Sequence, residues 1–179
     1  MFVQSVALEA IPEYARVAPT VLTSVLSRML ADPDALTLAL DDGFRAMESR
    51  QPCLAEFVSG ELAVIDGPKI SAVGYFLAVL VYLAFEEAFG DRLGRVQNND
   101  VLQTLDRLVT DGELRSQSTD GASYSEDAIA LGQPALIALL RSEVDRALED
   151  APNTASERID ALYEMLLVEL LALTRVVAA

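Results

Sequence analysis

Sixteen consecutive uncharged residues, Ile70 to Phe85, constrain the fold of this chain more than any other feature. The whole chain of 179 residues has a formal net charge of −15, so charges are frequent elsewhere and absent here. A helix that is apolar on all sides has to be buried, either inside a helical protein or in lipid. The run is shorter than the ~20 residues that span a bilayer, and it contains Ser71, Tyr75 and Tyr82. We therefore expect residues 70–89 to form the central helix of a water-soluble bundle.

Apolar residues recur at helical spacing along the rest of the chain, and no stretch alternates long enough to predict a confident strand. Proline and aspartate mark several helix starts, because proline tolerates the first turn and aspartate caps free amides. The pattern predicts a single all-α domain over residues 1–179, a helical bundle of about seven helices without a visible internal repeat. The other predicted helices are 19–31, 36–47, 52–65, 98–112, 134–150 and 154 to the end.

The composition argues against several classes of function. Twenty-eight acidic residues against 13 basic ones make non-specific binding to nucleic acid or to an anionic membrane unfavourable. Without histidine there is no serine–histidine triad, no Glu-x-x-His di-iron motif and no usual nitrogen-ligated zinc site. We expect a protein that is not an enzyme and has no catalytic residues, no metal and no cofactor.

The single cysteine indicates the cellular compartment. Cys53 has no partner in the chain, so no intramolecular disulfide can form and a reducing, cytoplasmic setting is expected. The N-terminus has no basic n-region of the kind that begins a secretory signal. Cys53 itself lies at the start of a predicted helix, where a thiol can become reactive, but a small, partly buried side chain is the simpler interpretation.

The last predicted helix is apolar around most of its circumference and leaves Asp160, Glu164, Glu169 and Arg175 for water. A helix that docks through one face only needs a narrower apolar stripe. Either other helices of the same chain cover it, or part of it contacts a second chain in a homo-oligomer. The residues predicted to bind a partner are Leu162, Leu166, Leu170, Leu173 and Val177.

The segment after the central helix resembles a winged helix-turn-helix. From Asn98 the chain reads NNDVLQTLDRLVTDGELRSQSTDGASYSED, a helix followed by a polar turn that looks like a recognition helix and a small β-wing at 113–127. The unit would cover 76–127, with only Asp91–Val96 for its middle helix. Residues 91–117 carry five acids and four arginines, which is not a phosphate-binding surface. If it read DNA, the resemblance implies Asn99, Gln103, Arg107 and Arg115 as the contacting residues; a plain helix plus surface loop is the alternative.

These observations favour a non-enzymatic binding or regulatory protein that acts through protein–protein contacts, as a homo-oligomer joined by the C-terminal helix. Neither nucleic acid nor membrane is an expected partner. Two other classes stay open. One is a winged-helix-type transcription regulator that uses residues 91–127. The other is a small-molecule-binding helical sensor with a pocket beside Tyr75, Phe76 and Tyr82.

Overall fold

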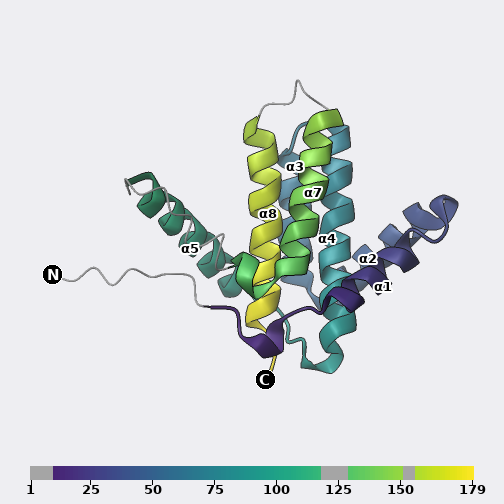
Figure 1. Ribbon diagram of the computed structural model, residues 1–179, viewed down its shortest axis with the longest axis horizontal. Helices are drawn as coiled ribbons and strands as arrows, with labels where there is room; N and C mark the ends of the chain where they lie inside the picture. The colour runs from purple at the N-terminus through teal and green to yellow at the C-terminus, as the bar shows by residue number, and fades with distance from the viewer. Residues whose placement is uncertain (1–9, 118–128, 151–155) are drawn as a thin grey trace.

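The computed structural model describes residues 10–117, 129–150 and 156–179, and every long element in these ranges is an α-helix (Figure 1). The prediction of an all-α helical bundle is confirmed. Over the described residues the structure forms no β-strand, and only an isolated bridge joins Leu93 to Val177. The helices are α1 (Pro19–Met29), α2 (Leu36–Arg50), α3 (Pro52–Val64), α4 (Pro68–Phe89), α5 (Asn98–Gln117), α7 (Pro134–Asp150) and α8 (Ser156–Arg175), and residues 129–132 add a helical turn before α7.

The uncharged run lies at the centre, as the sequence predicts. α4 packs against α1, α2, α3, α7 and α8, and the side chains from Leu77 to Tyr82 are all fully buried. Pro68 opens the helix, and Gly90, with a φ of 50°, ends it in a conformation that glycine adopts without strain. By length and composition, residues 68–92 could also cross a membrane; here the helix is the core of the bundle.

The chain is built from two halves that repeat one arrangement. In the first half α1 packs on α4, and in the second half α5 packs on α8. Each half also reaches into the other, because α1 contacts α7 while α5 contacts α3. The arms made by α1–α2 and by α5 leave the central helices on opposite sides, which gives the molecule an approximate two-fold appearance (Figure 1).

A buried glutamine in the first half fastens the segment that begins the second half. The Gln51 amide donates to the carbonyl oxygen of Gly94 (2.9 Å) and accepts from the backbone N–H of Val96 (2.8 Å). The Arg95 side chain donates in return to the carbonyl oxygen of Arg50. One amide therefore satisfies a donor and an acceptor of an extended strand-like segment. We call this arrangement the Gln51 clamp.

The same clamp occurs with the roles of the halves exchanged. The Gln133 amide donates to the carbonyl oxygen of Ala15 (2.7 Å) and accepts from the backbone N–H of Val17 (2.9 Å). Arg16 donates to the carbonyl oxygen of Gly132 at 3.0 Å, the counterpart of the bond from Arg95. Both glutamines precede a proline that opens a helix, and both are buried. The Gln133 clamp thus holds the chain before α1 against the start of α7.

The clamps define which residues correspond. The triplet 15–17 (Ala-Arg-Val) matches 94–96 (Gly-Arg-Val), which equates α1 with α5; the Gln-Pro pairs equate α3 with α7. For the central pair we infer the register from Gly74 and Leu162, which touch as equivalent residues near a two-fold axis do: a Cβ built on Gly74 would lie 2.5 Å from the Leu162 Cδ1. In that register Tyr75 corresponds to Tyr163, and both side chains are half-buried. The repeat is therefore one of structure, and the sequence does not show it.

The described residues do not form the winged helix-turn-helix that the sequence resembles. A middle helix is missing between α4 and α5, because Gly90–Arg92 forms a single 3₁₀ turn and the chain beyond it is extended in the Gln51 clamp. α5 does not close at Gly112 but continues to Gln117, so the first five residues of the predicted wing are helical. The remaining wing residues, 118–127, lie outside the described ranges.

Candidate functional site

The five side chains predicted to bind a partner are buried by their own chain. Four of them are fully buried, and Val177 is nearly so. α8 is covered by α3, α4, α5 and α7, which explains its broad apolar surface without a second chain. In the folded chain a homo-oligomer would therefore have to use another surface than Leu162, Leu166, Leu170, Leu173 and Val177.

Glu169 is the main departure from the charge pattern expected for α8. Asp160, Glu164 and Arg175 are exposed as predicted, but Glu169 is fully buried. Neither of its carboxylate oxygens has a hydrogen-bond partner in the described part of the chain. Burial raises the pKa of Glu169 well above its ordinary value, because the charged form loses its hydration without compensation. The corresponding residue of α4 in the Gly74–Leu162 register is Val81.

The residues named for the DNA-binding alternative do not form one basic face. Asn99 and Gln103 are exposed, and Gln103 accepts a hydrogen bond from Arg175 at 2.7 Å. Arg107 is half-buried and faces a hollow between helices. Arg115 belongs to the last turns of α5, and its side chain is outside the described part of the structure.

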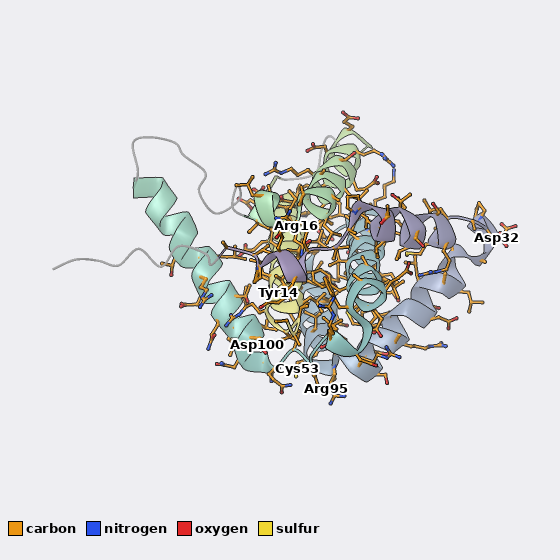
Figure 2. All side chains as sticks on the ribbon, turned by 60° about the horizontal axis from the view of Figure 1, so that its bottom comes forward. Tyr14, Arg16, Asp32, Cys53, Arg95 and Asp100 are labelled. Carbon is orange, nitrogen blue, oxygen red and sulfur yellow. The ribbon has the colours of Figure 1, made fainter. Side chains whose placement is uncertain are left out.

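Two arms carry exposed apolar side chains. Leu30 at the end of α1 and Leu38 on α2 are 49% and 62% exposed; on α5, Leu102 and Val109 are 63% and 52% exposed. Leu30 and Val109 occupy corresponding positions of α1 and α5 in the repeat. Figure 2 shows Asp32, which follows Leu30 closely, at the far tip of the α1–α2 arm, remote from α5.

A hollow of about 320 Å³ lies between α5, α8 and the segment before α1. Its lining includes Ile11 and Tyr14 from that segment, Thr104 and Arg107 from α5, and Arg175 from α8. The Gln133 clamp fixes the segment that forms the outer wall, and Figure 2 shows Tyr14 lying over the bundle beside Arg16. No carboxylate side chain is among the described residues that line it. We call this feature the arginine hollow.

The aromatic cluster considered for a small-molecule pocket is packed rather than open. Tyr82 is fully buried and its hydroxyl donates to the Glu86 carboxylate at 3.3 Å. Tyr75 stacks against Phe44 with ring centroids 5.2 Å apart. Burial raises the pKa of Tyr82, in keeping with a hydroxyl that stays protonated. The arginine hollow is in a different place, between α5, α8 and the segment before α1.

Cys53 and the described acidic residues are the remaining candidates for a reactive or metal-binding site. Cys53 is a free, half-buried thiol on the first turn of α3. Within residues 10–117, 129–150 and 156–179, no group of three or more acidic or cysteine side chains could hold a metal ion. The arms and the arginine hollow are therefore the features of the described chain from which a function can be argued.

No protein-family model matches this chain, and the comparisons with curated proteins and with solved structures also return no match.

Proposed function

We propose that this chain is a non-enzymatic binding module that contacts a protein partner through the α1–α2 arm. The observation that carries the proposal is the pair of leucines, Leu30 and Leu38, exposed on an arm that projects from the bundle (Figure 1). When a partner covers large exposed apolar side chains, the free energy of association falls by about 25 cal/mol per Å² of apolar surface removed from water.

The charge of the arm indicates the kind of partner. Residues 30–48 contain five acidic residues and one arginine, Arg45, which already lies 3.8 Å from Asp42. Like-charged surfaces repel, so a partner with apolar anchors flanked by lysine or arginine would be attracted and an acidic one rejected. The proposed partner is therefore a protein segment that is basic and amphipathic.

Homo-oligomerisation fits this proposal less well. A second copy of this chain would bring the same acidic arm, or another acidic surface of a molecule with a net charge of −15, against the first. The leucine-rich face of α8 is not available either, because the chain itself buries it. We propose a hetero-association, and size-exclusion chromatography with light scattering measures the mass of the chain alone.

Removing the two exposed leucines is expected to weaken partner binding at least tenfold. The partner is first captured from the native cell extract on the full chain, identified and purified. Its dissociation constant is then measured by calorimetry for the wild-type chain and for the double variant L30S/L38S. Raising the salt concentration from 50 to 300 mM should weaken the wild-type complex, because charge steering is screened.

The matched control is V64S, since Val64 is 76% exposed and lies at the end of α3, which is not one of the two arm helices. It should bind like the wild type. Equal dissociation constants for wild type, L30S/L38S and V64S would overturn the proposal, as would the failure of any protein to exceed the capture on a blank resin.

A further inference from the structure

We propose that the arginine hollow is a binding site for a small organic anion that has one carboxylate or phosphate group and a short apolar tail. The site is independent of the arm and lies on the other side of the bundle. The repeat supports this assignment, because at the equivalent place in the first half the chain itself supplies the anion.

In the first half, an arginine of α1 meets a carboxylate of α4. Arg28 donates to Glu87 at 2.7 Å, and the Ser24 side chain of α1 helps to stabilise the charged form of the same carboxylate. The hydrogen bond from Arg28 has the largest effect on the pKa of Glu87 and lowers it; burial acts in the opposite direction, and Ser24 adds a smaller lowering effect. α1 and α4 are thus joined across their surface by a matched pair of charges.

In the second half the carboxylate is replaced by a cation. Arg107 of α5 corresponds to Arg28, Gln103 to Ser24, and Arg175 of α8 to Glu87, by the two registers established above. A hydrogen bond still joins α5 and α8 at this place, since Arg175 donates to the Gln103 amide oxygen at 2.7 Å. Two guanidinium groups therefore line one hollow at the place where the first half has an arginine–glutamate pair.

The neighbours of Arg175 leave its charge uncompensated. Its guanidinium group donates to the neutral amide of Gln103, and it forms no ion pair with any residue of the described ranges. By contrast, Arg28, Arg50 and Arg158 each pair with a carboxylate. In a chain with a net charge of −15, the uncompensated charge of Arg175, at a hollow that Arg107 also lines, creates a local positive field, and this selects an anion.

The walls define the rest of the ligand. Guanidinium groups bind carboxylate and phosphate oxygens through paired hydrogen bonds. Tyr14 and Thr104 line the same hollow, but the Thr104 hydroxyl already donates to the carbonyl oxygen of Asp100 at 2.7 Å. Ile11 and Leu171 provide an apolar surface for a short tail. A volume of about 320 Å³ is at the small end of the range for ligand sites, so a molecule of several carbon atoms fits and a large cofactor does not.

The test compares an anion with a neutral molecule of the same shape. The ¹⁵N-labelled full chain is titrated with hexanoate, hexyl phosphate and hexanamide, and amide shifts are followed by NMR. Hexanoate or hexyl phosphate is expected to saturate shifts in residues 104–107 and 171–175, and the tighter of the two identifies the head group. Hexanamide is expected to bind at least tenfold more weakly.

Two variants of Arg175, which is exposed and so tolerates exchange, test the role of charge. R175Q should weaken the anion at least fivefold, and R175E should abolish binding because it rebuilds the arginine–glutamate pair of the first half. R158Q is the control and should bind like the wild type, because Arg158 lies on the first turn of α8, at the opposite end of the helix from Arg175. The proposal is overturned if neither anion binds at 20 mM, if hexanamide binds as well as hexanoate, or if R175E retains binding.

Discussion

Replacing Glu169 by leucine is expected to raise the free energy of unfolding at pH 7 by roughly 2–5 kcal/mol. The wild-type carboxyl group is fully buried with both oxygens unpartnered, so folding removes its hydration and returns nothing. Leucine has a similar volume and adds apolar contacts at a position where the other half has Val81. Urea unfolding followed by circular dichroism measures the change.

The pH dependence separates this cause from a general packing gain. The pKa of Glu169 is raised in the folded chain, so between its unfolded and folded values only the unfolded state loses the proton. The wild type should therefore be most stable, as far as this group is concerned, below about pH 4.3. Above that value its stability should fall by up to about 1.4 kcal/mol per pH unit until the folded pKa is reached.

E169Q removes the titration and keeps the polar side chain, so its stability should be less dependent on pH than that of the wild type while it gains less than E169L. The matched control is E164Q, because Glu164 is exposed on the same helix and its removal should change stability by less than about 0.5 kcal/mol. A wild-type stability that rises with pH above 5 relative to E169Q would contradict the burial of Glu169 as a neutral acid.

The sequence predicts the helices well and their arrangement poorly. Apolar spacing and proline starts place α3, α4 and α7 within a few residues of their observed bounds, because these signals are local. The repeat is hidden because few residues are identical between the halves and the separation of equivalent residues grows along the chain. What repeats is a hydrogen-bonding pattern around Gln51 and Gln133, and a buried amide has no distinctive sequence signal.

The candidate sites show the same limit. The apolar surplus of α8 could be read from the sequence, but whether other helices or a second chain cover it depends on α3 and α5, which pack on it from distant parts of the chain. As a charged residue Glu169 is expected to face water, yet at ~100° per residue it lies about 140° around the helix from the exposed Glu164. The sequence suggests Arg107 only as a DNA contact, because its place beside Arg175 at one hollow follows from the packing of α5 on α8.

Removing the Gln51 clamp is expected to cost roughly 3–5 kcal/mol of unfolding free energy, the largest loss predicted for any single side chain here. Q51A leaves the backbone N–H of the fully buried Val96 and the carbonyl oxygen of Gly94 without their partner, at about 1–3 kcal/mol for each group. Gln97 is the control, since its exposed amide donates to the Arg95 carbonyl oxygen and Q97A should change stability little.

Q133A breaks the same two kinds of bond, yet its effect should be smaller and more local. The Gln51 clamp holds a segment between α4 and α5, so its loss disturbs the junction of both halves. The Gln133 clamp holds the segment before α1, which can separate from the bundle while the helices stay packed. Hydrogen exchange should therefore show fast exchange confined to Val17 and its neighbours in Q133A, and raised exchange across α3, α5 and α8 in Q51A. Equal, global effects of the two variants would mean that the segment before α1 is as central to the fold as the junction.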